Sequence, residues 1–274
     1  PLLLSLVTAT KAFSYQLGRF PYTISAFTCS YTHHYYLVIG KVMNKIGILG
    51  AMDEEVALLK ASLSEVKEVQ WKHLTFYQGM LHGVDVILVK CGIGKVASAL
   101  ATTVLIEQFS PDAIVNTGSA GGFDTQLNIG DLVIGENLIH HDVDLTHFGY
   151  SLGQCAGMPE DYKSDPKLIE AAQHAANDIS GIQVTSGLIC TGDAFIGSDE
   201  AVAALRTKFP AMKAVEMEGA AIGQTCYMLD VPFLVIRSLS DIAGKTSSVS
   251  FKEYLETAAK NSAKLVMAMV KALA

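Results

Sequence analysis

After Met43, short apolar runs alternate with longer helical patterns, and this alternation constrains the fold more than any other feature of the sequence. Continuous apolar runs of this kind are typical of strands that are buried on both faces of a sheet. The segments expected to form strands are 45–50, 73–81, 84–90, 112–118, 131–139, 184–192 and 232–241. The segments expected to form helices are 53–63, 95–109, 164–179, 198–209 and 250–272. The sequence therefore predicts a single α/β domain over residues 44–274, with a mixed sheet flanked by helices.

Local signals mark the ends of several of these elements. His82 and Gly83 separate two apolar runs and predict a hairpin. Ser164 is expected to cap the helix that follows it, with Pro166 in the first turn. The stretch AVEMEGAAIG, residues 214–223, is expected to pass from a strand into a helix.

The first 43 residues differ from the rest of the chain because they contain no Asp or Glu. They show no clear helical or strand periodicity, and their opening PLLLSLV is shorter than the apolar core of a secretory signal. A buried-strand pattern begins directly after Met43, as it would after a natural start. Three interpretations stay open: translated upstream sequence, a targeting segment, or an integral part of the fold. We expect residues 1–43 to lie outside the functional domain.

Charge and cysteine usage argue against several classes of protein. The chain has 27 acidic and 20 basic residues, a net charge of -7, whereas a nucleic-acid surface needs a basic stripe. No run approaches the roughly 18 to 20 apolar residues that span a bilayer. The five cysteines are scattered and never form a CxxC pair, which favours free thiols in the cytoplasm over disulfides or a zinc site. We expect a cytoplasmic protein that binds neither nucleic acid nor membranes.

Glycine and acidic residues gather at the predicted carboxyl ends of the strands, where ligands bind in α/β sheets. These ends carry GAMDEE (50–55), GIG (92–94), GSAGG (118–122), GDAF (192–195), EME (216–218) and SD (240–241). Lysine is sparse at these positions. The pattern favours a polyhydroxyl or neutral ligand over a phosphate.

Three motifs raise other chemistries that their context argues against. CGIGKVA (91–97) is similar to a dinucleotide-binding turn, but the acid expected about 20 residues later is missing. HHDVDLTH (140–147) lacks an H-E-x-x-H pattern or a Cys partner, so a polar loop or a subunit contact is favoured over a metal site. Ser119 lacks the G-x-S-x-G context of a nucleophile, and NTGSAGG is expected to offer backbone N–H groups to a ligand or to form a structural turn. We therefore expect no cofactor and no metal.

Four carboxylates stand in apolar surroundings: Glu55, Glu216, Glu218 and Asp241. Burial of an unpaired charge costs on the order of several kcal/mol, so each acid needs a partner or a function. Compensation of the helix dipole is the alternative role for Glu55. Asp241 closes an apolar strand, where desolvation raises the pKa of a carboxyl group, although Arg237 would oppose this if it lay close. Acids at separate strand ends predict general acid–base catalysis on a sugar-linked substrate.

Seven ordered blocks give the chain its resemblance to a known family. They are KIGILGAMDEEV, GIGKV, NTGSAGG, DVDLTHFGY, GDAFI, VEMEGAA and RSLSD. The chain resembles the purine nucleoside phosphorylase superfamily and, more closely, the bacterial 5′-methylthioadenosine/S-adenosylhomocysteine nucleosidases, from about Lys45 to Ala274. The resemblance implies a three-layer fold around a mixed, partly barrel-like sheet. It also implies a homodimer that hydrolyses the N-glycosidic bond of these two nucleosides.

The resemblance implies a role for each acid of the site. Glu55 would activate a water molecule that Ser119 and Arg237 hold. Asp241 would protonate N7 of adenine, so that the base leaves as a neutral molecule from an oxocarbenium-like ribose. Glu218 would accept hydrogen bonds from the ribose hydroxyls.

The resemblance also implies which residues hold the substrate. Phe195 would stack on adenine and the backbone of Ile196 would read its edge. Leu145, Phe148 and Tyr150 of a neighbouring subunit would line an apolar slot for the 5′-thio group. The other residues implied at the binding site are Met52, Ile93, Ala120, Gly121, Glu216, Met217 and Ser240. Of these, Glu216 is the least explained, and we expect it to pair with a nearby donor.

The first strand end favours hydrolysis over phosphorolysis, because Met52 and Glu55 stand where a phosphorylase needs a cationic group for phosphate. The alternatives are a nucleoside phosphorylase, a nucleosidase for another adenosine derivative such as aminodeoxyfutalosine or 5′-deoxyadenosine, and a non-catalytic nucleoside sensor. The combination of Glu55, Glu218 and Asp241 argues against the sensor, which needs ribose contacts but no acid or base.

Overall fold

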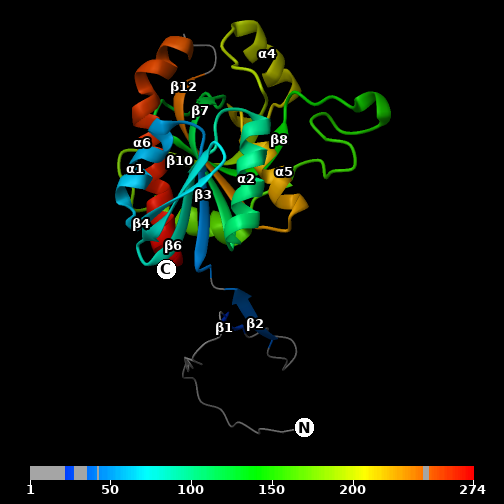
Figure 1. Ribbon diagram of the computed structural model, residues 1–274. Coiled ribbons are helices and arrows are strands. Elements are labelled where there is room, and N and C mark those ends of the chain that lie inside the picture. Colours follow the sequence, from blue (N-terminus) through cyan, green and yellow to red (C-terminus); the bar gives the residue numbers. More distant parts are fainter. Residues whose placement is uncertain (1–21, 28–35, 42, 243–246) are drawn as a thin grey trace. The chain divides into compact units, whose positions relative to one another are not determined.

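The computed structural model describes residues 22–27, 36–41, 43–242 and 247–274 (Figure 1). The chain divides into two compact units, Pro1–Val42 and Met43–Ala274. In the first unit, β1 (Tyr22–Phe27) and β2 (Tyr36–Lys41) form an antiparallel pair that the sequence analysis did not predict. The rest of 1–43 lies outside the described residues, and the three interpretations of this segment stay open.

The described strands of the second unit form one ten-stranded mixed sheet. They are β3 (Lys45–Gly50), β4 (Ser64–Trp71), β5 (Leu74–Leu81), β6 (Val84–Lys90), β7 (Ala113–Gly122), β8 (Leu132–His140), β9 (Tyr162–Lys163), β10 (Val184–Thr191), β11 (Met212–Glu216) and β12 (Phe233–Ile242). Their order is β11, β10, β8, β12, β7, β3, β6, β5, β4, with β9 beside β8. β11 also pairs with β7, Val215 opposite Gly121, so that β7, β12, β8, β10 and β11 close into a ring. The prediction of a mixed, partly barrel-like sheet is confirmed.

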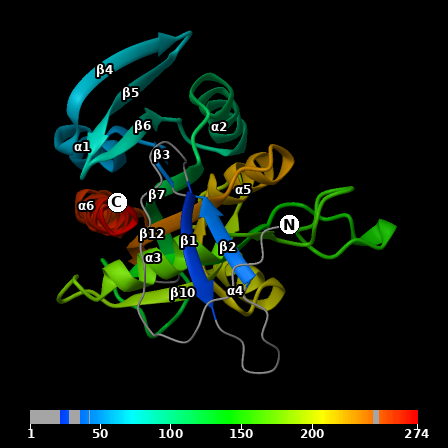
Figure 2. The same cartoon turned by 90° about the horizontal axis from the view of Figure 1, so that it is seen from below.

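Helices cover the sheet on both faces, as the three-layer prediction requires. They are α1 (Asp53–Ser62), α2 (Lys95–Phe109), α3 (Pro166–Ala176), α4 (Asp199–Lys208), α5 (Gly219–Met228) and α6 (Ser247–Leu273). α1 and α3 pack on α6, which lies against β7 and β12, whereas α2 packs with α5 on the other side (Figures 1 and 2). None of the described helices is long and apolar enough to cross a membrane.

Strand β3 shows how the sheet separates two apolar cores. Ile46 and Ile48 belong to the core beneath α1 and α6, whereas Leu49 belongs to the core beneath α2. Each fully buried side chain of this size stabilises the fold by about 1.5–3 kcal/mol. Gly47 faces α2, where an added Cβ would lie 2.5 Å from Cδ2 of Leu105. The glycine therefore allows α2 to pack directly against the strand.

Most of the predicted elements are confirmed, including the hairpin of β5 and β6. His82 and Gly83 have φ of 51° and 89°, the left-handed conformation that a tight two-residue hairpin turn requires. Strand β4 was not predicted, because nearly all of its side chains are exposed and so leave no apolar alternation in the sequence. The alternative that GSAGG (118–122) forms a turn is wrong, since β7 continues to Gly122.

The prediction that Ser164 caps α3 is wrong. Asp165 is the N-cap, and its Oδ1 accepts hydrogen bonds from the backbone N–H groups of Lys167 and Leu168. Pro166 occupies the first turn as predicted. Ser164 is instead buried at 5% exposure, and its hydroxyl has no hydrogen-bond partner among the described residues.

This geometry predicts opposite outcomes for two adjacent substitutions. Asp165→Ala removes the only side-chain cap that the structure describes on α3 and should lower the free energy of unfolding by about 1 kcal/mol. Ser164→Ala removes a hydroxyl without a described partner and should have little effect or a slightly stabilising one. Urea denaturation of both variants measures the difference. A larger loss for Ser164→Ala would contradict the capping assignment.

Candidate active site

Side chains from separate strand ends meet at one edge of the strand ring. Glu55 comes from the first turn of α1, directly after β3, and Ser119 lies on β7. Glu216 is the last residue of β11, and Arg237 lies on β12, opposite Gly118 of β7. The four polar side chains, those of the two glutamates, the serine and the arginine, are almost fully buried. Groups far apart in the sequence therefore share one water-poor environment.

Glu55 is 1% exposed and is held by four donors. Its Oε2 accepts hydrogen bonds from the backbone N–H groups of Ala51 at 2.7 Å and Met52 at 3.2 Å. Its Oε1 accepts from the backbone N–H of Ser119 at 2.8 Å and from the Ser119 hydroxyl at 3.0 Å. The first pair is what a helix-start acid needs, but the second pair ties the carboxylate to β7. Dipole compensation alone does not account for this geometry.

Arg237 links the carboxylates of the site. Its Nη2 donates to Glu216 and, at 3.3 Å, to Oε2 of Glu218. The same nitrogen donates to Oδ1 of Asn116 at 2.5 Å. Burial lowers the pKa of the guanidinium, but the neighbouring carboxylates outweigh this effect and raise it. An added Cβ on Gly118 would lie 2.6 Å from Oε1 of Glu55 and would also meet the guanidinium, so the close approach requires glycine.

Glu216 and Glu218, which are two positions apart in the sequence, have different surroundings. Both oxygens of Glu216 are used within the protein: Oε2 accepts from the backbone N–H groups of Glu218 and Gly219 and from Arg237, and Oε1 accepts from the Thr191 hydroxyl. Glu216 therefore pairs with nearby donors. Its geometry leaves little capacity for a ligand.

Glu218 is more weakly compensated than Glu216. Its Oε1 accepts from the backbone N–H of Gly94 at 2.9 Å, and its Oε2 lies 3.3 Å from the Arg237 guanidinium. Burial is the main cause that raises the pKa of Glu218, to about 7; Arg237 opposes the rise and Glu216 adds to it. A carboxyl group in this state has capacity for further hydrogen bonds.

Asp241 lies at a bulge near the end of β12. The pairing of β12 with β7 shifts register between Leu239 and Asp241, so that Asp241 lies opposite Gly121. Bulges of this kind re-aim side chains and are common beside active sites. Asp241 is 3% exposed, and its Oδ1 accepts a hydrogen bond from the Ser240 hydroxyl at 3.0 Å.

A small cavity of about 40 Å³ opens beside Asp241. Its lining residues are Gly121, Ala194, Phe195, Ile196, Val215, Glu216, Met217 and Asp241. Phe195 is 53% exposed and packs edge to face against Phe251, with ring centroids 5.9 Å apart. The cavity therefore joins a buried carboxyl group to an exposed aromatic wall.

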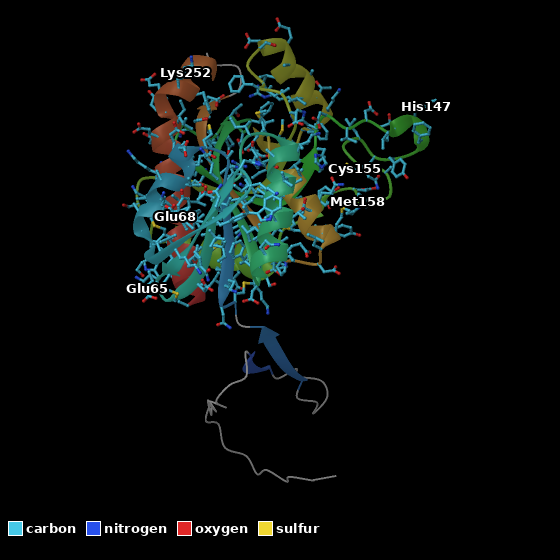
Figure 3. All side chains as sticks on the ribbon, viewed as in Figure 1. Glu65, Glu68, His147, Cys155, Met158 and Lys252 are labelled. Carbon is cyan, nitrogen blue, oxygen red and sulfur yellow. The ribbon has the colours of Figure 1, made fainter. Side chains whose placement is uncertain are left out.

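The structure does not bring all the predicted site residues together within one chain. Leu145, Phe148 and Tyr150 lie on the projecting loop that also carries His147, shown in Figure 3, and Phe148 is 73% exposed. Ile93 is 56% exposed at the start of α2, while Met52 and Met217 are half-buried. Ala120 is buried on β7 beside Ser119.

The sequence analysis missed two buried polar residues of the site. Asn116 accepts from Arg237 and donates from Nδ2 to the carbonyl oxygen of Leu49 at 3.0 Å. Thr191 donates to Glu216 and accepts from the backbone N–H of Ala220 at 2.8 Å. Each directly follows a run of three apolar residues, 113–115 or 188–190, and a polar residue in that position is the signal that could have identified them.

The polar residues of 140–147 that the structure describes pair largely with protein groups. His140 lies 3.0 Å from Oε1 of Gln224, Asp142 accepts from Lys95, and Asp144 accepts from Thr146. Among the described residues, no group of three or more His, Cys, Asp or Glu side chains is placed to hold a metal ion.

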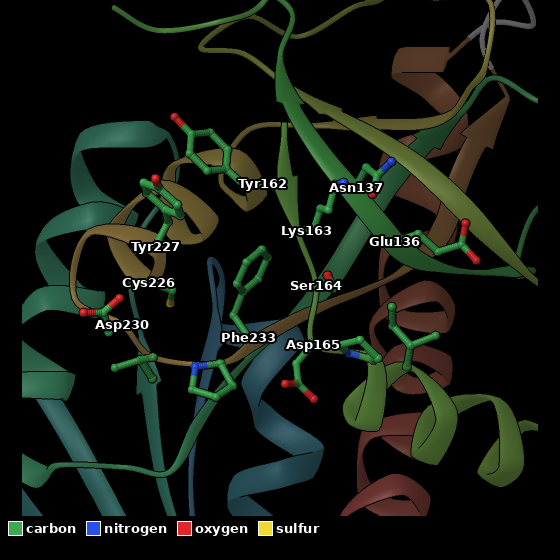
Figure 4. Close-up of a pocket in the computed structure, with 14 residues that line it drawn as sticks. Glu136, Asn137, Tyr162, Lys163, Ser164, Asp165, Cys226, Tyr227, Asp230 and Phe233 are labelled. Atoms are coloured by element: carbon green, nitrogen blue, oxygen red, sulfur yellow. The ribbon is translucent and has the colours of Figure 1, made fainter. Parts of the chain in front are cut away.

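A larger cavity, of about 600 Å³, lies away from these groups (Figure 4). Its lining residues come from β8, β9 and the adjoining ends of α3, α5 and β12; they include Glu136, Tyr162, Ser164, Tyr227 and Phe233. None of the predicted site residues lines it. The candidate site is therefore assigned from its buried charges and donors and not from volume.

The raised pKa of Glu218 predicts a pH-dependent stability. Because its pKa rises from 4.5 to about 7 on folding, the folded protein keeps a proton that the unfolded chain releases in this interval. The free energy of unfolding should therefore fall as pH rises from 4.5 to 7, whereas Glu218→Gln lacks this contribution. Relative to that of wild type, the free energy of unfolding of Glu218→Gln should rise by up to about 3 kcal/mol between pH 4.5 and 7. Urea denaturation at several pH values measures it, and a constant difference would contradict the prediction.

The chain is similar to known proteins over most of its length. Residues 45–271 match the family model described as Phosphorylase superfamily. The chain is 54% identical over 229 residues to the 5′-methylthioadenosine/S-adenosylhomocysteine nucleosidase of Psychromonas ingrahamii, covering 84% of this chain and 99% of that protein.

Solved structures of such nucleosidases are also similar. The enzyme from Colwellia psychrerythraea, in complex with adenine, has a TM-score of 0.83 and 52% identity, covering 84% of this chain and 96% of that one. The enzyme from Neisseria meningitidis, in complex with methylthio-immucillin-A, has a TM-score of 0.82 and 47% identity, covering 84% and 99%. The chain belongs to the phosphorylase superfamily and, within it, to the 5′-methylthioadenosine/S-adenosylhomocysteine nucleosidases.

Proposed function

We propose that this protein hydrolyses the N-glycosidic bond of 5′-methylthioadenosine and S-adenosylhomocysteine, releasing adenine and the 5-thioribose product. Family membership supports the reaction, and the buried carboxylates at one edge of the strand ring support its chemistry. Hydrolysis of a glycosidic bond needs an acid for the leaving group and a base for water. Asp241 and Glu55 fill these two roles in the proposal.

The charge balance of the site is the observation that favours water over phosphate as the nucleophile. Among the described residues, Arg237 is the only Lys or Arg that is buried, and the Nη2 of its guanidinium already binds Glu216, Glu218 and Asn116. The four buried carboxyl groups of the site, Glu55, Glu216, Glu218 and Asp241, outnumber this one cation. A phosphate anion would enter this site without a free cationic partner, whereas a neutral water molecule meets no such barrier.

In the proposed mechanism, Glu55 accepts a proton from the attacking water. Its four hydrogen-bond donors fix the orientation of the carboxylate, and Ser119, which contacts Glu55, would help to bind the same water. Asp241 donates a proton to N7 of adenine, so that the base departs neutral. One general acid contributes about 10²- to 10⁴-fold, so the water base and the ribose contacts must supply the rest.

The remaining side chains would hold the substrate in place. Glu218 accepts hydrogen bonds from the ribose hydroxyls, and these donors compensate a carboxyl group that the protein itself compensates only in part. Phe195 stacks on the purine and the backbone of Ile196 contacts its edge, both from the lining of the small cavity. Met52 and Ile93 face the 5′-thio substituent.

We propose that the functional unit is a homodimer formed through α2 and α5. These two helices pack together and expose several large apolar side chains, which are Val96 (81% exposed), Leu100 (40%), Tyr227 (54%) and Met228 (62%). A cavity of about 360 Å³ lies on the same face, lined by both helices and by Val143 and Cys155 of the projecting loop. An apolar patch of this kind marks an interaction surface. In the dimer, Leu145, Phe148 and Tyr150 would complete the partner's 5′ slot.

We also propose that the reaction belongs to nucleoside catabolism and methionine salvage in the cytoplasm. Cys91, Cys155, Cys190 and Cys226 are free thiols, which suits a reducing compartment.

The pure protein should release adenine from both thio-nucleosides in buffer without phosphate, because the site accommodates water and lacks a free cation for an anion. Chromatography of the products, with and without added phosphate, measures this. Strict phosphate dependence would identify a phosphorylase. Release only from another 5′-modified adenosine would move the substrate assignment, and binding without turnover would identify a sensor.

Two variants test the proposed base and acid, and a third serves as their control. Glu55→Gln and Asp241→Asn should each lower the rate of adenine release by at least about 10²-fold while the fold persists. Glu54→Gln, on the same helix turn but exposed, should behave as wild type. Near-normal turnover in either of the first two variants would refute the role assigned to that residue.

The proposed interface predicts that Val96→Glu yields a monomer with lowered activity. The charge would be buried against the partner, and the partner's loop would no longer complete the 5′ slot. Sedimentation equilibrium and the adenine assay measure both effects. Val66→Glu, at a position on β4 that is 45% exposed, is the matched control. A dimeric Val96→Glu protein would contradict the interface.

A further inference from the structure

Helix α2 begins without a capping side chain of its own. Its N-cap is Gly94, whose φ is 95°. The first backbone N–H groups of a helix need acceptors, and here two carboxylates from distant segments supply them. The N–H of Gly94 donates to Oε1 of Glu218 at 2.9 Å, and the N–H of Lys95 donates to Oδ1 of Asp193 at 2.8 Å. One helix end therefore fixes two acids that follow different strands.

The Asp193 carboxylate occupies space that exists because residue 94 is glycine. An added Cβ on Gly94 would lie 2.8 Å from Oδ1 of Asp193. Asp193 follows β10 and stands two residues before Phe195, at the start of the segment that lines the small cavity. Its bond to α2 therefore sets where this segment leaves the sheet.

Asp142 completes a closed set of hydrogen bonds around Asp193. The backbone N–H of Asp193 donates to Oδ2 of Asp142 at 3.0 Å, and Nζ of Lys95 donates to Oδ1 of Asp142 at 2.7 Å. Burial raises the pKa of Asp142, but the Lys95 ammonium and the Asp193 N–H outweigh this and lower it. Charge-assisted hydrogen bonds are about twice as strong as neutral ones, so this closed set holds Asp193 although the residue is exposed.

We propose that Asp193, held by Lys95 and Asp142, is a positioning residue that fixes the purine-binding segment 194–196 relative to Glu218. This inference rests on the proposed function, because it assumes that the purine stacks on Phe195 and that the ribose binds Glu218. Asp193 and Glu218 both accept hydrogen bonds from the N-terminus of α2. A change at Asp193 therefore alters the distance between Phe195, which stacks on the purine, and Glu218, which binds the ribose.

The test compares Asp193→Ala with Asp193→Asn in the full chain. Loss of the carboxylate should raise KM for 5′-methylthioadenosine and Kd for adenine by about tenfold or more, with a smaller change in kcat, since a hydrogen bond to a charged group is lost at the purine wall. The amide oxygen of Asn still accepts from the Lys95 N–H, so Asp193→Asn should remain within about threefold of wild type. Adenine binding by calorimetry needs no turnover and reports on the purine wall alone.

Lys213→Met is the matched control, because it breaks the Lys213–Asp124 ion pair, which is 2.6 Å long and lies outside the site. This pair is partly buried, as is the pair of Lys95 and Asp142. It should lose stability without changing KM or adenine affinity. Wild-type KM and Kd in Asp193→Ala would overturn the inference. Equal losses of adenine affinity in Asp193→Ala, Asp193→Asn and Lys213→Met would also overturn it. If wild-type protein released no adenine from any substrate, the proposed function would fail instead, and adenine binding would still test the positioning of the purine wall.

Discussion

The buried guanidinium of Arg237 is the interaction on which the rest of the site depends. It stands at 1% exposure on β12 and binds Glu216, Glu218 and the side chain of Asn116. Carboxylates gathered at this density would not stay buried without a cation, since removal of one partner from a buried ion pair costs about 3–5 kcal/mol. Gly118 lets the guanidinium and Glu55 approach the same point of β7. The pairing thus holds three strands and the first turn of α1 in one arrangement.

That arrangement exists because the sheet closes on itself. β11 pairs with β10 on one side and with β7 on the other, which brings the end of β11 beside β7, a strand that precedes it by about a hundred residues. The bulge before Asp241 then aligns it with Gly121 on the same edge. Closure turns strand ends that an open sheet would spread out into one group of buried side chains.

In the proposed function, the site selects its substrate through a carboxyl group, that of Glu218, whose hydrogen bonding the protein itself completes only in part. Glu216 is satisfied by protein donors, whereas Glu218 has one backbone donor and a 3.3 Å contact with the Arg237 guanidinium, and burial raises its pKa to about 7. In the proposed function, a substrate with hydroxyl donors would complete the hydrogen bonding of Glu218, whereas an anion would meet more acids than cations. In the proposed reaction, the same excess of acids over one buried cation favours ribose hydroxyls as ligands and water as the nucleophile.

The order of strands and helices after Met43, the α/β class and the family follow from the sequence alone, because apolar periodicity and short motifs are local properties. Motifs also identified Glu55, Glu218 and Asp241 as candidates, because the sequence itself shows their residue types and their positions at predicted strand ends. Three things required the tertiary structure: the exposed strand β4, the capping of α3 by Asp165, and the roles of Asn116 and Thr191. The difference between Glu216 and Glu218 was also decided there, because Glu218 binds Gly94, 124 positions away, whereas Glu216 binds Thr191, 25 positions away, and no local pattern encodes these partners.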